Sequence, residues 1–137
     1  MRYFGNFKRP IDGKKRVSLP AVFRLSAEDR KFKSVILFKG ITENFLFGAG
    51  SDAVSRIIDD KSNHALEAAC RLGFEHIVDQ EGRIRLSDEL LNEMFPSAKE
   101  ILFVGAGGKF EIRDISYWDE AQERAAKTAV DELYKAL

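Results

Sequence analysis

The sequence is poor in the residues that mark secreted, metal-binding and membrane proteins. It has one cysteine in 137 residues, and it lacks any apolar run as long as the roughly 18 residues of a membrane-spanning helix. Cys70 alone cannot form a disulfide within the chain, and no Cys/His spacing typical of a metal site is present. The first ten residues also lack the apolar core of a signal peptide. We therefore expect a cytoplasmic protein with no cofactor, no metal and no membrane contact, in which Cys70 is a small buried residue.

The composition is that of a folded globular protein. Hydrophobic residues make up 45% of the chain, charged residues 32%, and there are 11 phenylalanines, which is too apolar for intrinsic disorder. A chain of this length forms either one domain or two small modules that share an interface.

Charge is unevenly distributed although the formal net charge is zero. Residues 1–40 contain 11 Lys and Arg against 3 Asp and Glu, whereas the rest of the chain contains 11 against 19. A basic segment joined to an acidic remainder is typical of a protein that presents one face to a polyanion. The alternative is that the two halves pair with each other or with a neighbouring subunit.

An internal repeat defines the expected architecture. Residues 7–19 align with residues 74–86 at an offset of 67, and residues 36–40 align with residues 101–105 at an offset of 65. A difference of two residues between aligned blocks is what a variable surface loop produces. The sequence therefore predicts two copies of one module, which we place at residues 1–66 and 67–137.

Each copy is expected to contain four short strands and two helices. The alternating or apolar runs predict strands near residues 7–11, 16–19, 35–39, 44–48, 74–78, 83–86, 101–104 and 109–113. Between the second and third strands, Pro20 precedes a short helix at residues 21–24, and Ser87 or Asp88 caps its counterpart. A longer helix follows each fourth strand, from Ser51 to residue 72 and from Ser116 to the end of the chain. Modules this small are expected to interlock into an α+β fold.

The motif Asp-x-x-x-Arg recurs in both copies, as Asp12 with Arg16 and as Asp79 with Arg83. In a tight turn, the carboxylate accepts hydrogen bonds from backbone N–H groups or from the guanidinium. In the second copy we favour a purely structural role, in which the pair holds a hairpin. In the first copy the cations outnumber the nearby acid, which favours contact with phosphate. These cations are Lys8, Arg9, Lys14, Lys15, Arg16 and Arg24.

No catalytic arrangement is visible in the sequence. The glycines at residues 105–108 precede Lys109, but the pattern lacks the earlier glycine and the following Ser or Thr of a nucleotide-binding loop. His64 and His76 have no acid or thiol arranged for metal binding, and no serine or cysteine has the context of a nucleophile. We therefore expect neither an enzyme nor a small-molecule substrate. Aromatic residues near the C-terminus are expected to pack or to form subunit contacts; these are Tyr117, Trp118 and Tyr134.

The repeated motif resembles that of the bacterial MraZ family. The resemblance rests on residues 12–24 in the first half and on residues 78–86, residues 104–112 and Trp118 in the second, and it extends over nearly the whole chain. It implies two tandem β-α-β modules of the SpoVT-AbrB type, with swapped hairpins that interlock into a small barrel in a pseudo-two-fold arrangement, each followed by a helix. It also implies a homo-oligomeric ring that binds direct DNA repeats in the promoter of the division and cell-wall gene cluster.

Two positions differ from the pattern of the family that it resembles. Lys15 stands where glycine is common before the arginine, which adds charge and alters the turn. Residues 86–88 lack the proline that commonly follows the second module's strand, so that the helix there is expected to start with a capping residue.

We therefore expect a sequence-specific DNA-binding repressor that acts in the nucleoid and regulates its own gene. The resemblance associates the turn regions with DNA, so the expected DNA-binding residues are Lys8, Arg9, Asp12, Lys14, Lys15, Arg16, Arg24, Asp79 and Arg83. The alternative is a protein-interaction module, antitoxin-like or a scaffold, whose basic hairpin binds an acidic partner.

Overall fold

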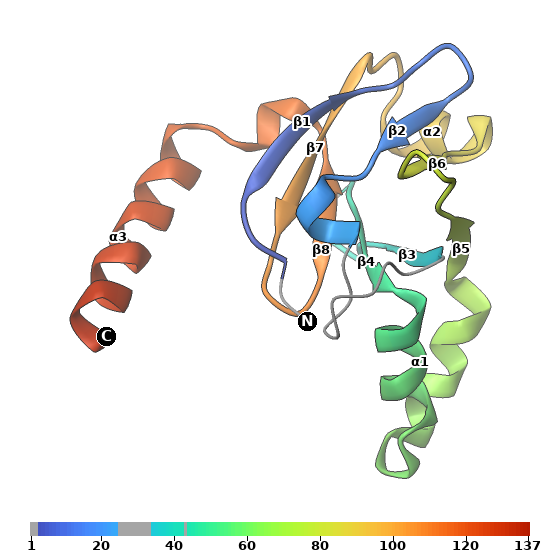
Figure 1. The fold of residues 1–137 in the computed structure, drawn as a ribbon, viewed down its shortest axis with the longest axis horizontal. Helices are drawn as coiled ribbons and strands as arrows, with labels where there is room; N and C mark the ends of the chain where they lie inside the picture. Colours follow the sequence, from blue (N-terminus) through green and yellow to red (C-terminus); the bar gives the residue numbers. More distant parts are fainter. Residues whose placement is uncertain (1–2, 25–33, 43) are drawn as a thin grey trace.

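Eight antiparallel strands form a six-stranded sheet and a two-stranded ribbon in the computed structural model, which describes residues 3–24, 34–42 and 44–137 (Figure 1). All eight strands that the sequence predicts are present, with ends that differ by no more than two residues from the prediction. Helical segments follow them, so the α+β class is confirmed.

The six-stranded sheet mixes strands from the two repeats. Its order is β1-β7-β8-β4-β3-β5, and these strands are Asn6–Pro10, Glu100–Gly105, Phe110–Arg113, Leu46–Gly50, Ser34–Lys39 and Phe74–Ile77. The edge strand β1 of the first repeat pairs with β7 of the second, and the other edge strand, β5 of the second repeat, pairs with β3 of the first. The equivalent strands of the two repeats are β1 and β5, β3 and β7, and β4 and β8. Each pair occupies matching positions counted from opposite edges, so the sheet is symmetric in the two repeats.

The two-stranded ribbon joins β2 (Arg16–Ser18) to β6 (Arg83–Arg85). Val17 lies opposite Ile84, and both side chains are buried in the core. The ribbon ends in two matching hydrogen bonds: Leu19 N–H donates to the carbonyl of Gly82 at 2.9 Å, and Leu86 N–H donates to the carbonyl of Lys15 at 2.9 Å. Each repeat contributes one strand, so the ribbon connects the two repeats.

A cluster of aromatic rings lies at the centre of the core. Phe23 is completely buried, and its ring packs edge-on against Tyr3 and Phe7 and stacks on Phe110, with centroid distances of 5.4, 5.6 and 5.5 Å. Phe23 belongs to the first repeat and Phe110 to the second. The hydrophobic core is therefore shared by the two repeats.

Two short helical segments follow the ribbon strands at the positions that the sequence predicts. The first, η1 (Ala21–Arg24), is a 3-10 turn anchored by Phe23. Its counterpart α2 (Asp88–Met94) begins at Ser87, whose hydroxyl accepts a hydrogen bond from Leu90 N–H at 3.1 Å. The expected capped start of this helix is therefore confirmed.

The predicted helix over residues 51–72 is interrupted. It consists of α1 (Ser51–Asp59) and the 3-10 segment η2 (Lys61–Leu72), because the extended backbone of Asp60 ends the first, while its carboxylate accepts a hydrogen bond from Ser62 N–H at 2.9 Å. The expectation that Cys70 is buried is wrong. Its side chain is exposed because η2 lies at the periphery, where a half-buried Ala69 is its innermost described residue.

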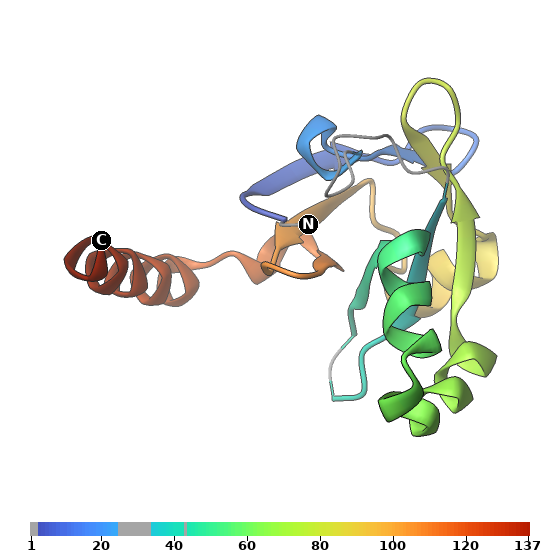
Figure 2. The same ribbon diagram turned by 60° about the horizontal axis from the view of Figure 1, so that its bottom comes forward.

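The C-terminal helix begins later than predicted and extends away from the sheets (Figures 1 and 2). The Asp114 carboxylate accepts from Ser116 N–H and holds a short 3-10 turn, η3 (Ile115–Tyr117). Helix α3 (Glu120–Ala136) then starts at Asp119, whose side chain accepts from Gln122 N–H at 2.9 Å. None of its residues is buried, and no described helix has the length and hydrophobicity needed to cross a bilayer.

Candidate functional site

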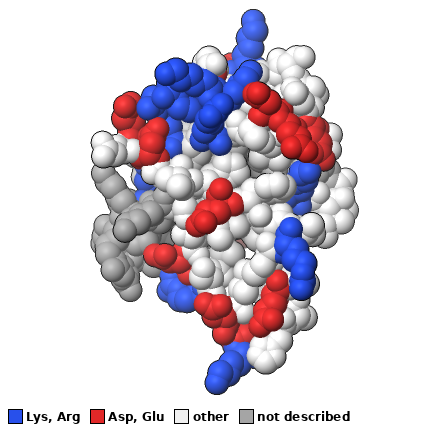
Figure 3. Space-filling view, turned by 90° about the vertical axis from the view of Figure 1, so that its right-hand side faces the viewer, with Lys and Arg blue, Asp and Glu red and all other residues white. Residues whose placement is uncertain are grey.

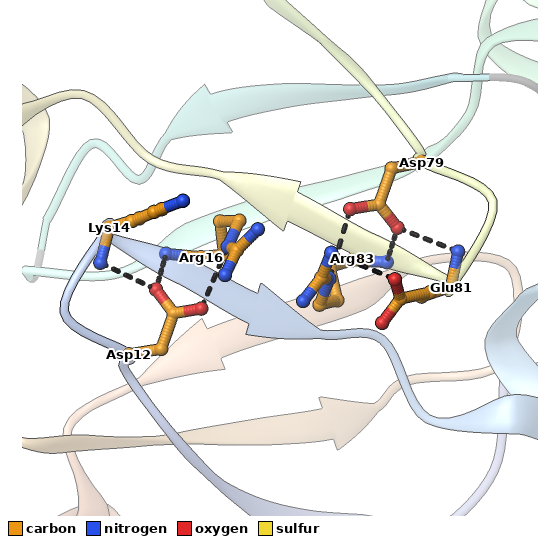
Figure 4. A network of polar contacts seen from close by, with 6 residues as sticks. All are labelled: Asp12, Lys14, Arg16, Asp79, Glu81 and Arg83. Atoms are coloured by element: carbon orange, nitrogen blue, oxygen red, sulfur yellow. Dashed lines mark hydrogen bonds and ion pairs between the residues drawn. The ribbon is translucent and has the colours of Figure 1, made fainter.

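The turn between β1 and β2 is closed by the carboxylate of Asp12 (Figure 4). One oxygen, Oδ1, accepts hydrogen bonds from Lys14 N–H at 2.8 Å and from Arg16 N–H at 2.9 Å. The other, Oδ2, accepts from Nε of Arg16 at 2.7 Å. The carboxylate therefore holds both the backbone of the turn and the guanidinium that leaves it.

The turn between β5 and β6 is built in the same way. Asp79 Oδ1 accepts from the backbone N–H groups of Glu81 and Arg83, both at 2.9 Å, and Oδ2 accepts from Nε of Arg83 at 3.0 Å. The two Asp-x-x-x-Arg motifs thus form equivalent structures, and Figure 4 shows the two arginines lying between the turns on one face of the ribbon. The structural role favoured for the second motif, closing a turn, is present in both, but the expected hairpin is wrong: β5 pairs with β3 and β6 with β2, so the turn joins strands of two different sheets.

These hydrogen bonds hold both aspartates in the ionised form. The backbone N–H of Arg16, with the guanidinium of the same residue and the N–H of Lys14, lowers the pKa of Asp12 from 3.8 to about 2. The backbone N–H of Arg83 likewise lowers the pKa of Asp79. Both aspartates are thus negatively charged near neutral pH, and each orients an arginine.

The two turns differ at the residue before the arginine. Gly82 has a φ of +80°, a conformation that glycine adopts readily, and the equivalent residue of the first turn is Lys15, with a φ of +64°. A lysine in this left-handed region is uncommon and unfavourable. The structure therefore explains why glycine suits this position. The expectation that Lys15 alters the turn is wrong, because the first turn has the same backbone hydrogen bonds as the second while it carries an extra positive charge.

Arginines dominate the outer face of the ribbon. Because Val17 and Ile84 are buried, their neighbours along each strand face outward, and in the pairing register Arg16 lies opposite Arg85. Like charges opposite each other destabilise a strand pair unless an anion lies near them. Arg85 is exposed, makes no ion pair within the described parts of the chain, and borders a hollow next to Glu75 and Asp88.

Sequence reasoning did not select Arg85. The alternation of Arg83, Ile84 and Arg85 was the available signal, since a strand with a buried isoleucine places both arginines on its other face.

The lysines near the first turn are exposed and lack an internal ion-pair partner among the described residues. These are Lys8, Lys14 and Lys15. Arg9, in contrast, is half-buried: its Nη1 donates to the carbonyl of Lys8 at 2.9 Å, and its guanidinium lies 5.4 Å from the ring centre of Phe7. In Figure 3, Lys and Arg side chains gather at the upper end of the molecule, at the height of the β1–β2 turn in Figure 1.

Arg24 contacts the second turn, although it follows the first turn and β2 in the sequence. Its guanidinium packs where a side chain on Gly82 would stand, so the second turn accommodates it only because that residue has no Cβ. Its Nε is buried without a hydrogen-bond acceptor in the described part of the chain. The first repeat thereby supplies positive charge to a turn that also contains Asp79 and Glu81.

The described residues contain no group of three or more His, Cys, Asp or Glu side chains placed to hold a metal ion. An apolar hollow between α1, η2 and β4 is lined almost entirely by aliphatic and aromatic side chains and has no acid, histidine or cysteine among its lining residues.

Comparison with known proteins identifies the family. The chain is 33% identical over 134 residues to a protein of Parvibaculum lavamentivorans named transcriptional regulator MraZ, and the match covers 88% of this chain and 83% of that relative. The chain belongs to the MraZ family. A family model for the MraZ protein, described as antitoxin-like, matches residues 73–134.

Further relatives carry the same name. The chain is 30% identical over 128 residues to transcriptional regulator MraZ of Alkaliphilus metalliredigens, covering 86% of this chain and 85% of that relative. It is 26% identical over 136 residues to transcriptional regulator MraZ of Mycoplasmopsis pulmonis, covering 96% and 88%. The recognition of the family from its repeated motif is thus confirmed.

Proposed function

We propose that this MraZ family member is a sequence-specific DNA-binding transcriptional repressor whose contact surface is the outer face of the β2–β6 ribbon with the β1–β2 turn. The observation that carries this proposal is the concentration of exposed cations that have no ion-pair partner among the described residues, namely Lys14, Lys15 and Arg85, together with Lys8 on the adjoining strand β1. Its relatives are named transcriptional regulators, which agrees with it.

The shape of the site suits duplex DNA. A two-stranded β-ribbon fits into the major groove, where bases present distinct patterns of donors and acceptors. Within the guanidinium of Arg16, only Nε donates to Asp12, and the terminal nitrogens have no partner among the described residues. They are available to bind a guanine edge, a contact that contributes about 1–3 kcal/mol of discrimination against other bases. Asp12 positions the arginine, while Lys14 and Lys15 contact phosphates.

We further propose that residues 1–66 and 67–137 are tandem SpoVT-AbrB-like modules with swapped hairpins. The exchange of edge strands supports it, because β1 pairs with the second repeat and β5 with the first. The contribution of one strand from each repeat to the β2–β6 ribbon supports it as well.

A homo-oligomeric ring on direct repeats completes the proposal. One ribbon per chain is a small contact area, and several identical subunits on successive repeats raise the effective concentration of each contact. The target would be the promoter of the division and cell-wall gene cluster, including the protein's own gene, in the cytoplasm at the nucleoid.

The test is binding to a duplex with the direct repeats found upstream of this protein's gene, against a scrambled duplex, at several salt concentrations. Arg16→Ala should lose the preference for the repeats, and Arg16→Lys should keep much of the phosphate-dependent affinity yet lose discrimination, because lysine lacks the planar fork. Arg124→Ala is the matched control, since this exposed arginine lies on α3, away from the ribbon.

Equal binding of wild type to both duplexes at every salt concentration would exclude sequence-specific recognition. Loss of the preference in Arg124→Ala as well would exclude the ribbon as its source. Circular dichroism and thermal unfolding of each variant separate a lost contact from a lost fold.

The second candidate is an antitoxin-like protein-interaction module, which the description of the matching family model favours. An acidic protein partner that co-purifies with the wild type, and not with a Lys14→Ala, Lys15→Ala double variant, would support it. Steep loss of DNA affinity with the logarithm of salt concentration supports the repressor.

A further inference from the structure

We propose that Glu81 weakens the second turn as a DNA contact by occupying Arg83, so that the ribbon engages DNA mainly through its first turn. This inference rests on the proposed function. It assigns a specificity-determining role to an acidic residue that lies outside the set of cations expected to bind DNA.

Glu81 and Lys14 occupy equivalent positions with opposite charge. Each is the second residue after the aspartate of its turn, and the backbone N–H of each donates to that aspartate's Oδ1, at 2.9 Å for Glu81 and 2.8 Å for Lys14. Both side chains are exposed. Two turns with one backbone design therefore present a carboxylate at one end of the ribbon and an ammonium at the other (Figure 4).

The carboxylate of Glu81 also contacts the arginine of its own turn. Its Oε1 lies 3.4 Å from Nη2 of Arg83, whereas Arg16 has no ion pair in the described residues besides that with Asp12. The Glu81 side chain is 72% exposed and that of Arg83 is 24% exposed. A guanine edge that binds both terminal nitrogens of Arg83 must therefore displace a carboxylate, while those of Arg16 have no ion-pair partner among the described residues.

The electrostatic balance of the two ends differs for the same reason. Both arginines lie beside an aspartate, but Lys14 and Lys15 precede Arg16, whereas Glu81 and Gly82 precede Arg83, with the guanidinium of Arg24 packed against Gly82. An exposed carboxylate repels phosphates, and binding at that end releases fewer counterions. The two ends of the ribbon thus differ in charge, which favours one orientation of the protein on the duplex.

Replacement of Glu81 should leave the turn intact. The hydrogen bonds that close it use the carboxylate of Asp79 and backbone N–H groups, including that of residue 81 itself. The backbone of Glu81 does not lie in the left-handed region, so other side chains fit there. A change in DNA binding of such a variant would therefore come from the side chain and its charge.

The experiment compares Glu81→Gln and Glu81→Lys with wild type on the repeat-containing duplex over a range of salt concentrations. Glu132→Lys is the matched control, because it makes the same charge change on an exposed residue of α3. We expect Glu81→Gln to bind roughly two- to fivefold more tightly than wild type. Glu81→Lys should gain more, and its slope of log affinity against log salt should steepen by about 0.9 because of one added phosphate contact.

The reciprocal variant tests the same idea from the first turn. Lys14→Glu should weaken binding strongly, and the double variant Lys14→Glu, Glu81→Lys, which leaves the net charge unchanged, should recover most of the affinity. Failure of wild type to bind the duplex would refute the proposed function. Binding by wild type with no gain in Glu81→Gln or Glu81→Lys beyond that of Glu132→Lys would overturn the role of Glu81 alone.

Discussion

At the scale of single residues, Lys15 lowers the stability of its turn and adds a positive charge to it. Its φ of +64° places a side chain where the equivalent turn has glycine. A strained residue of this kind persists when its surroundings hold it in place, and such positions cluster at functional sites. Here the two backbone bonds to the Asp12 carboxylate hold the turn.

We expect Lys15→Gly to raise the free energy of unfolding by about 1 kcal/mol or less, since relief of the left-handed conformation exceeds the added flexibility of the unfolded chain. The same variant should bind DNA more weakly because one cation is lost. Gly82→Ala is the reciprocal control: it should destabilise, because the new Cβ would collide with Arg24. Urea unfolding measures both, and a less stable Lys15→Gly would contradict the strain argument.

The aspartates of the turns should make stability depend on pH in the acid range. Their pKa values are lower in the folded chain than the ordinary value of 3.8, to about 2 for Asp12. The ionised forms therefore stabilise the fold fully above about pH 4, and this contribution is lost as the pH falls toward 2. The double variant Asp12→Asn, Asp79→Asn should show a flatter fall in unfolding free energy over this range, and an unchanged slope would place the linkage elsewhere.

At this scale the sequence allowed part of the candidate site's geometry to be predicted. The repeated motif selected both aspartates and both arginines, because their spacing is local and defines a turn. The position of Arg24 on the second turn could not be predicted, since it depends on how the two repeats interlock. Strand alternation is enough to predict that Arg85 faces outward. The charge pattern of the sequence, however, points to the first forty residues, where cations cluster, and not to Arg85.

Short elements in this fold are held by tertiary packing rather than by their own propensity. A 3-10 turn of four residues such as η1 has almost no stability alone. The strands were predictable because alternation of buried and exposed residues is a local signal. The interruption of the helix at Asp60 was not, because residues 61–72 retain helical composition and only the extended backbone at Asp60 separates them from α1.

At the scale of elements, a substitution of Phe23 tests whether packing holds η1 in place. Its ring packs on Tyr3, Phe7, Phe103 and Phe110, which connects η1 to the core. We expect Phe23→Ala to lower the free energy of unfolding by about 3–5 kcal/mol, as for other buried phenylalanines. Phe4→Ala is the control, because that ring is 69% exposed and should change stability little. Similar losses in the two variants, measured by urea unfolding, would contradict this account of η1.

At the scale of the whole molecule, the two repeats complete one another. The sequence revealed that two copies exist, but not which strands pair, because the strands of either copy satisfy the same apolar pattern. The structure shows β1 paired with β7, β5 with β3, and β2 with β6. Neither repeat alone contains the partners of its own first two strands.

This interlocking predicts the behaviour of a split chain. Cleavage at the extended, exposed junction at Asp60 gives fragments 1–60 and 61–137, which divide the strand pairs and the aromatic cluster between them. Each fragment alone should lack cooperative thermal unfolding, since it keeps one strand pair, β3–β4 or β7–β8, loses the pairings between repeats and is too small for its own core. Mixed in equal amounts, they should regain the circular dichroism and unfolding transition of the intact chain, because the pairing restores a shared core. Fragment 1–60 with a cooperative transition of its own would show that the first repeat is an independent domain.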